Sequence, residues 1–425
     1  MTRRTARLAA ALAAALLLTA CTGGGDGPAP AAAPPTKHPV FGEKLERQVF
    51  LALRRTQKEG GNARFTQTLT FESAKGRAVR TVSGRLDFAG GTGEATIRWQ
   101  VPEAYSEEVK DLLLGRAPGQ GHGDAAGRLH VDGQHLTYRA DTSDYWLRYG
   151  RADYDTGRAT GQGPGALDHL RGTEAAVGGT LLEGLSGTEA VSRSDGTGGR
   201  TYRAEMTSTV SALLLPDTIA SQLAGEDLGF GLYREKKPFP VTVTVDGRGM
   251  ITHARADLSQ LLGKKGSPFR DVTAVRMELA LSGIGTSKPS AAAEGTVLPA
   301  GRTVRTVWEV EAGHCVDFTT GQQNVELVAD IPCSRTHDGR VLAQVSFGGS
   351  AYPGASAAKG QARDACRRAY RRASADWTGE ADEKGTYWFM WSDERSWRRD
   401  GGGRAVCYVV TPKGADRDSG ARDAS

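Results

Sequence analysis

"FPVTVTVDGRGMITHARADLS", residues 239–259, is the stretch of sequence that best defines the fold. Valines alternate with threonines from 241 to 245, and this period of two is typical of a β-strand with one buried face. Asp246 and Gly247 follow, with Gly249 close behind, and such residues between alternating flanks favour a tight turn. The stretch therefore predicts a β-hairpin whose first strand has one apolar and one polar face.

The same period of two returns at several other points of the chain. The segment 128–138 holds Asp132-Gly133 between alternating flanks and predicts a second hairpin. Short strands are also expected at 144–149 and 200–206, and a last strand at 271–284. An antiparallel sheet with one apolar face must cover that face with something. On two further strands, 63–71 and 93–102, the residues that share an apolar face are Phe65, Leu69, Phe71, Ile97, Trp99 and Val101.

Three other segments have helical rather than strand-like spacing. A helix over 43–58 is predicted by the recurrence of Val40, Leu45, Val49, Phe50 and Leu53. Helical spacing also occurs in 165–177 and in 208–225. We expect the helical segment 213–223 to cover part of the apolar face of the sheet.

The order of these elements over 40–285 resembles the LolA-like lipoprotein family. The most family-like piece is 240–251, a strand, an Asp/Gly turn and a second strand. The resemblance implies an α+β fold, in which an antiparallel curved half-barrel sheet carries covering helices. It also implies an apolar or lipid ligand in the half-barrel cavity, so the six apolar-face residues named above are the candidate ligand-binding residues. The alternative is that the same apolar faces form a core that the protein fills by itself.

The N-terminal segment predicts export and a lipid anchor. Three arginines precede an apolar run over 8–20, which is shorter than the roughly 20 residues that a membrane span needs. This arrangement is typical of a secretory signal peptide over 1–20. The run Leu18-Thr19-Ala20-Cys21 resembles the lipobox of bacterial lipoproteins, which implies a diacylglycerol on the Cys21 sulfur and cleavage just before it. We therefore expect a lipid-anchored, extracytoplasmic protein on the outer face of the cytoplasmic membrane; the alternative is a plain signal peptide with a chance cysteine.

Four of the five cysteines lie in the last 111 residues of the chain: Cys315, Cys333, Cys366 and Cys407. An even number in an exported chain indicates disulfides, and four cysteines allow three pairings. The alternative is a zinc site, because His314 and His337 lie near Cys315 and Cys333 at a tolerable ligand spacing. An oxidising compartment favours the disulfides, so we expect no metal.

The surroundings of these cysteines resemble the septum-formation family of actinobacterial extracytoplasmic domains, over about 105 residues. The resemblance implies a small α+β domain with Cys315 joined to Cys333 and Cys366 joined to Cys407. The chain departs from the family at Arg340, where an acid is usual. The matching positions are Gly313-x-Cys315, Pro332-Cys333, His337, Cys366 with Tyr370, Trp397, Gly403-Arg404 and Cys407.

Two further patterns occur in this cysteine-rich region. The segment 363–373 predicts a helix with Arg363, Arg367 and Arg371 in one stripe, which we interpret as a solvated face rather than a site for anionic lipid or cell-wall phosphate. The segment 387–397 is rich in aromatic residues, which we interpret as core rather than as a platform for sugar or peptide. Its members are Trp388, Phe389, Trp391 and Trp397.

The domain boundaries follow from composition. Gly, Pro and Ala dominate 21–39, which we expect to be a flexible tether, and 286–303 has the composition of a linker. The expected organisation is a signal peptide over 1–20, the tether over 21–39, a half-barrel domain over 40–285, the linker over 286–303, a disulfide-bonded domain over 304–411 and a disordered tail over 412–425.

No catalytic motif supports an enzyme. The chain has no Gly-x-Ser-x-Gly, no His-Glu-x-x-His, no Walker loop and no dinucleotide fingerprint, so we expect no catalytic residue and no cofactor. The formal charge is +5, and the three signal-peptide arginines account for more than half of it, which makes nucleic acid an unsuitable partner. The expected partners are the membrane, through Cys21, and an apolar or lipid ligand. The alternative function is a cell-envelope interaction or sensory lipoprotein, linked to septum formation, that carries no ligand.

Overall fold

The computed structural model describes residues 38–115, 125–132, 135–150, 181–206, 214–215, 219, 222–223, 238–263, 266–290, 293–320, 326–379 and 386–411. The predicted signal peptide, Cys21, most of the tether, the segment 165–177 and the tail 412–425 lie outside these residues. Both sheets described below belong to one compact unit, Pro35–Ser425.

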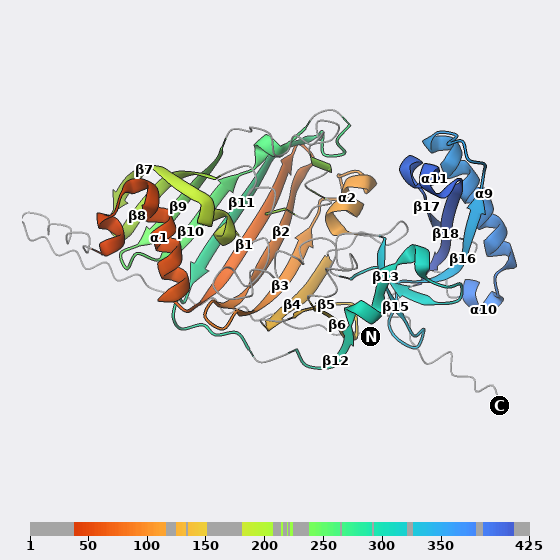
Figure 1. Ribbon diagram of the computed structural model, residues 1–425, viewed down its shortest axis with the longest axis horizontal. Coiled ribbons are helices and arrows are strands. Elements are labelled where there is room, and N and C mark those ends of the chain that lie inside the picture. The colour runs from red at the N-terminus through yellow and green to blue at the C-terminus, as the bar shows by residue number, and fades with distance from the viewer. Residues whose placement is uncertain are drawn as a thin grey trace, which may run out of the picture. The chain divides into compact units, whose positions relative to one another are not determined.

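The larger sheet has twelve strands in the order β12-β6-β5-β4-β3-β2-β1-β11-β10-β9-β8-β7 (Figure 1). Neighbouring strands are antiparallel except β12 and β6, which are parallel. The segment 271–284, predicted as the last strand, lies in the middle of the sheet, because β11 pairs with both β1 and β10. The strands are β1 (Asn62–Ser73), β2 (Gly76–Asp87), β3 (Thr92–Gln100), β4 (Ala125–Asp132), β5 (Leu136–Ala140), β6 (Tyr145–Tyr149), β7 (Thr188–Gly196), β8 (Gly199–Met206), β9 (Phe239–Asp246), β10 (Ile251–Asp257), β11 (Val272–Ser282) and β12 (Thr296–Pro299).

The predicted hairpin of 239–259 is confirmed as β9 and β10. The Asp246 carboxylate accepts hydrogen bonds from the backbone N–H groups of Arg248 and Met250, both at 3.0 Å. Gly249 has a φ of 78°, in the left-handed region that a residue without a Cβ adopts easily. The alternation of valine and threonine also holds, since the valines of β9 are buried.

One face of the sheet, here called the inner face, carries the core. Residues opposite each other on antiparallel strands point to the same side, so one row of the inner face runs through Tyr202, Val243, Ala254, Leu279, Gln67, Val82 and Ile97. All but Ile97 are buried. The outer face carries the polar partners of the alternation, such as Arg64 and Thr66, which are exposed.

Helix α1 (Leu45–Lys58) lies on the inner face and confirms the helix predicted over 43–58. It packs against β7 and β10. Hydrogen bonds also join α1 to the sheet. Gln48 accepts one from the Tyr202 hydroxyl at 2.8 Å, and the Thr56 hydroxyl accepts one from the Ile251 N–H at 2.8 Å. Phe50, one of the residues whose spacing predicts this helix, is 38% exposed, because packing on the sheet buries only the arc around Val49 and Leu53.

Other helices add to the same core. Of the segment 213–223, the described Leu214, Leu215, Ile219 and Leu223 are buried in the core cluster of the larger sheet. Helix α5 packs against β10 and β11. The helices and 3-10 turns of this region are η1 (Pro39–Gly42), α2 (Glu107–Leu114), α5 (Leu181–Gly184), η2 (Leu185–Gly187) and η5 (Ser259–Leu261).

The smaller sheet has six strands in the order β13-β15-β14-β16-β18-β17, with α9 packed on β16, β17 and β18 (Figure 1). The protein is therefore of the α+β class, with a large curved antiparallel sheet and a second, smaller, disulfide-bonded sheet. Its elements are β13 (Val304–Thr306), η6 (Val307–Glu309), β14 (Cys315–Asp317), β15 (Leu327–Ile331), β16 (Gly339–Phe347), α9 (Ala355–Arg372), α10 (Ala375–Thr378), β17 (Trp388–Trp391), α11 (Glu394–Asp400) and β18 (Gly403–Val410).

The segment 286–303, predicted as a linker, contains regular secondary structure. Its second half forms the edge strand β12 and the short helix α8 (Ala300–Thr303), and Ala300 is buried. Val304 and Leu327, which follow the predicted linker, are buried in the core of the larger sheet. Linker-like composition ends at 295, and the apolar Val297 and Leu298 that follow suit an edge strand.

Candidate functional site: the inner face of the larger sheet

The six residues predicted to bind a ligand all belong to the inner-face core or pack against it. Phe65, Leu69, Phe71 and Trp99 are at most 4% exposed. Phe71 lies between two other rings, with centroids 6.2 Å from Trp99 and 5.8 Å from Phe269. Ile97 and Val101 are half-buried. Four of the six are therefore interior residues of the protein, and two remain partly accessible.

The part of the inner face over β8–β11 is filled by the chain itself. Helix α1 covers it through Val49 and Leu53, which are at most 2% exposed. Gln67, on the inner face of β1, accepts a hydrogen bond from the Leu181 N–H at 2.7 Å and thereby holds the start of α5. This part of the face has the properties of an ordinary core.

The part of the inner face over β3–β5 is less completely buried. Ile97, Val101 and Tyr138 pack against the core and remain half-buried. The Tyr138 ring lies over Gly127 of β4, where a Cβ would come within 2.7 Å of the ring. Ile97 is opposite the same Gly127, so Ile97 and Tyr138 both lie next to this glycine on the inner face. We call Ile97, Val101 and Tyr138 the β3–β5 patch.

A buried arginine lies in the apolar row beside this patch. Arg80 is opposite Leu69 on one side and Trp99 on the other, so its side chain starts from the inner face. It is 7% exposed. Loss of contact with water lowers the pKa of Arg80 to about 10, against a smaller opposite influence of Tyr138, so the guanidinium remains protonated at neutral pH.

The sequence reasoning missed Arg80 and Gln67. Both side chains are polar, but both are in phase with buried apolar neighbours, as Gln67 lies between Phe65 and Leu69 on β1. Arg80 is two residues from Ala78 and two from Val82, both buried, and this phase was the signal available in the sequence.

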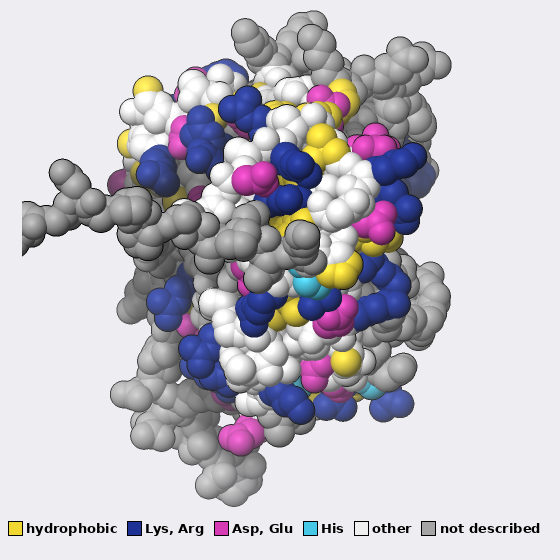
Figure 2. All heavy atoms as spheres, turned by 90° about the vertical axis from the view of Figure 1, so that its left-hand side faces the viewer, with side chains coloured by type: hydrophobic (Ala, Val, Ile, Leu, Met, Phe, Trp, Pro, Cys, Tyr) yellow, Lys and Arg dark blue, Asp and Glu magenta, His cyan; other side chains and the backbone are white. Residues whose placement is uncertain are grey.

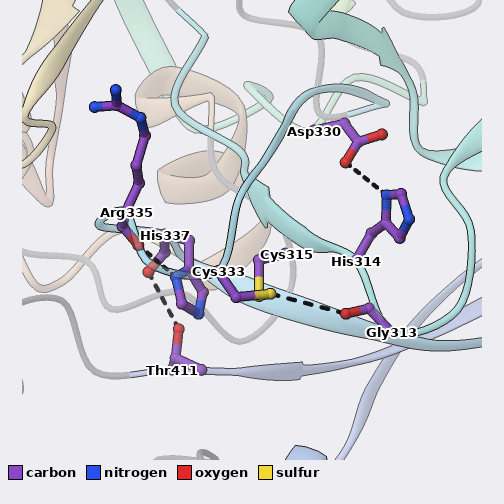
Figure 3. The surroundings of a disulfide bond; sticks show 8 residues. All are labelled: Gly313, His314, Cys315, Asp330, Cys333, Arg335, His337 and Thr411. Atoms are coloured by element: carbon purple, nitrogen blue, oxygen red, sulfur yellow. Dashed lines mark hydrogen bonds and ion pairs between the residues drawn. A yellow bond between two sulfur atoms is a disulfide. The ribbon is translucent and has the colours of Figure 1, made fainter. Parts of the chain in front are cut away.

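The disulfide pairing implied by the family resemblance is confirmed. Cys315 is joined to Cys333 and Cys366 to Cys407, with Cα atoms 5.1 and 5.3 Å apart. The second bond ties α9 to β18. Figure 3 shows the surroundings of the first bond.

The two histidines of the zinc alternative make other contacts. His314 Nδ1 lies 2.9 Å from the Asp330 carboxylate, and Figure 3 shows that ring turned toward Asp330. His337 Nδ1 lies 2.7 Å from the Arg335 carbonyl oxygen. In the part of the chain that the structure describes, no three His, Cys, Asp or Glu side chains come together as metal ligands would.

A buried carboxylate connects the two sheets. Asp317 of β14 is fully buried and accepts hydrogen bonds from Ser143 Oγ at 2.9 Å and from the Tyr145 hydroxyl at 3.0 Å. Burial, together with the negative charge of Asp317, raises the pKa of Tyr145, so its phenol stays protonated and donates. The Tyr149 hydroxyl donates to the Thr320 carbonyl oxygen at 2.5 Å. Two tyrosines of β6 thus reach β14 of the smaller sheet and the segment that follows it.

The aromatic residues of 387–397 do not form one core cluster as predicted. Trp397 is fully buried, but Trp388 is 37% exposed. Phe389 and Trp391 lie half-buried, with ring centroids 5.7 Å apart. Successive residues of a strand point to opposite faces, which separates Trp388 from its neighbours. Arg363, Arg367 and Arg371 are exposed, as both interpretations of this stripe require.

No protein-family model matches the chain, and no curated protein matches it. Among solved structures, the chain is similar to lipoprotein LppX of Mycobacterium tuberculosis (14% identity, TM-score 0.25, 57% of this chain and 98% of that one). It is also similar to a LolA superfamily protein of Nitrosomonas europaea (10%, 0.22, 58% and 96%) and to MucB in complex with MucA(peri) (11%, 0.20, 86% and 93%). At these values the likenesses assign no function to this chain.

In the described parts of the chain, no helix is both long enough and apolar enough to cross a membrane.

Proposed function

We propose that this protein is an extracytoplasmic lipoprotein that binds an apolar or lipid ligand on the inner face of its larger sheet, at the β3–β5 patch. The observation that carries the proposal is the contrast in burial along this face. Tyr202, Val243 and Leu279 are fully buried under the protein's own helices, whereas Ile97 and Tyr138 remain half-buried. No catalytic step, cofactor or metal is part of this function.

The energetics of the patch suit an acyl chain. Burying a methylene group contributes about 0.8 kcal/mol, so a few methylenes laid on the patch give measurable affinity without a charged contact. Most ligand sites are mainly apolar with few polar groups. The inner face beside the patch is likewise mainly apolar, and Arg80 and Tyr138 supply its few polar groups.

The experiment is a titration of delipidated protein with a fluorescent fatty acid. Ile97→Trp fills the patch. We expect it to weaken binding at least about tenfold, because the ligand then loses contacts worth the burial of two methylene groups. Thr96→Trp is the matched control, because Thr96 is the neighbouring residue on the opposite face of β3. Absence of binding by the unmodified protein, or equal binding by the Ile97→Trp variant, contradicts the proposal.

Attachment to the membrane is the second part of the proposal. The lipobox-like Leu18–Cys21 supports a diacylglycerol on Cys21 and a location on the outer face of the cytoplasmic membrane. Cys21→Ser removes the sulfur that carries the lipid, so we expect the protein to be released or to remain uncleaved. Membrane-bound and normally processed Cys21→Ser protein contradicts this part alone.

The alternative function is a cell-envelope interaction or sensory lipoprotein that carries no ligand. The completely filled inner face over β8–β11 favours it, because a ligand has no access there. Its link to septum formation depends on the family resemblance of 304–411. If the fatty-acid titration shows no binding, this function replaces the first.

A further inference from the structure

The outward side of α1 carries an unusual stripe of side chains. At 100° per residue, Arg47, Phe50, Leu51, Arg54 and Lys58 all fall within one third of the helix circumference, opposite the buried arc around Val49 and Leu53. We call these five residues the α1 outer stripe. It contains three cations and two large apolar residues, and it has no acid.

Of the two apolar members of the stripe, Phe50 is exposed and Leu51 packs partly against the core of the larger sheet. Phe50 is 38% exposed and, with Val191 and Trp388, is one of three exposed large hydrophobic residues in the described parts of the chain. Leu51 beside it is half-buried. A fully solvated surface helix has no need of an exposed phenylalanine between cations.

Among the described residues, none neutralises the cations of the stripe. None of Arg47, Arg54 and Lys58 forms an ion pair with a described residue. The neighbouring Arg55 does, with Glu59 at 2.7 Å, but both lie beside the stripe. Strand β7, on which α1 packs, adds the exposed Arg193, which is opposite Tyr202 of the inner face. Figure 2 shows the side of the molecule that carries α1, β7 and β8, where basic side chains lie among hydrophobic and acidic ones.

From these observations we propose that the α1 outer stripe binds the surface of an anionic membrane. Basic residues around exposed Phe and Leu are the composition of a helix that lies in the membrane interface, with the apolar side chains at the acyl boundary and the cations among phosphate groups. The inference adds a second membrane contact to the proposed lipid on Cys21, one that fixes the orientation of the larger sheet.

The position of α1 in the chain supports a membrane surface as the partner of the α1 outer stripe. Only 18 positions separate Cys21 from Pro39, where the first described element begins. A chain of that length spans at most about 60 Å, so the lipid anchor keeps α1 near the bilayer and makes a weak surface contact effective.

The α9 arginines do not fit this role. Arg363, Arg367 and Arg371 are exposed as well, but the outward side of α9 has no large apolar residue, and Arg367 lies 3.6 Å from Asp364. The α9 stripe is therefore a matched control, since it allows the same number of charges to be removed from a second helix of the same protein.

The test measures sedimentation with vesicles of the chain that begins at residue 22, which keeps every described residue and carries no lipid or signal peptide. The vesicles contain phosphatidylcholine alone or phosphatidylcholine and phosphatidylglycerol in equal parts. We expect binding only to the anionic vesicles, weakened by salt. Each basic residue near such a surface contributes about a fivefold factor, so the Arg47→Gln/Arg54→Gln/Lys58→Gln variant should bind roughly 100-fold more weakly.

Three comparisons decide the outcome. Phe50→Ser should also weaken binding, and the Arg363→Gln/Arg367→Gln/Arg371→Gln variant should bind like the unmodified chain. Absence of binding to anionic vesicles, or an equal loss in the α1 and α9 variants, overturns the inference. Fatty-acid binding by the α1 variants is measured in parallel and should be unchanged, which separates this inference from the proposed ligand site.

Discussion

The two sheets of this protein are stabilised in different ways. The larger sheet has one extended apolar core, which β13 and β15 of the smaller sheet also join, and it has no described cysteine. The rest of the smaller sheet packs in two small clusters and carries two disulfides. A small core buries too little apolar surface to be stable alone, and covalent links make up the difference. The core of the larger sheet buries enough apolar surface to keep the sheet folded while the β3–β5 patch stays partly exposed.

The largest expected effect comes from removing both disulfides. They close loops of 18 and 41 residues, and on the chain-entropy model the two together contribute about 7 kcal/mol. We expect the variant with all four cysteines changed to alanine to lose amide protection throughout β14–β18 and α9. Hydrogen exchange read by mass spectrometry measures this by segment, and an equal loss in β9–β11 contradicts the contrast between the sheets.

Phe71→Ala tests the larger core in the same way. Phe71 is fully buried and packed between Trp99 and Phe269, so its truncation should cost about 3–5 kcal/mol of unfolding free energy. The loss of protection should appear in β1–β3 and leave the disulfide-bonded region largely unchanged. Thr68→Ala, on the outer face of the same strand, is the control. If Phe71→Ala lowers the free energy of unfolding by less than about 1 kcal/mol, this core does not determine the stability of the larger sheet.

A smaller effect is expected where the sheets meet. Asp317→Ala leaves the hydroxyls of Ser143 and Tyr145 without their buried acceptor, at a cost of about 2–3 kcal/mol, and Tyr145→Phe removes one hydrogen bond at about 1 kcal/mol. Urea unfolding of the full chain measures both. If Tyr145→Phe costs as much as Asp317→Ala, the carboxylate is not the centre of this junction.

The strands with regular alternation were predictable from the sequence. The hairpin of β9 and β10, strands β1 and β3 and helix α1 follow from local periods and turn residues. Strand β2 was not predictable in this way. Its Arg80 points inward and its Val79 does not, which is the reverse of the usual alternation of apolar inward and polar outward residues. Strand β7 was missed because nearly all of its residues are exposed at the edge of the sheet.

Other features depend on contacts that no local pattern contains. The pairing of β1 with β11 joins segments about two hundred residues apart, and the outward position of Phe50 is decided by how α1 packs on the sheet. For the candidate site, the sequence identified Ile97 and Val101 but not Tyr138, and it did not indicate which apolar residues stay accessible. That distinction depends on which helices cover which strands.

The most direct test of the central claim is native mass spectrometry of the protein purified from its own membrane in mild detergent. We expect, besides any covalent lipid on Cys21, a non-covalent mass that dissociates on activation, that is lost in Ile97→Trp protein and that persists in Thr96→Trp protein. A spectrum with no dissociable mass, or one with the same mass in the Ile97→Trp variant, contradicts ligand binding at the β3–β5 patch.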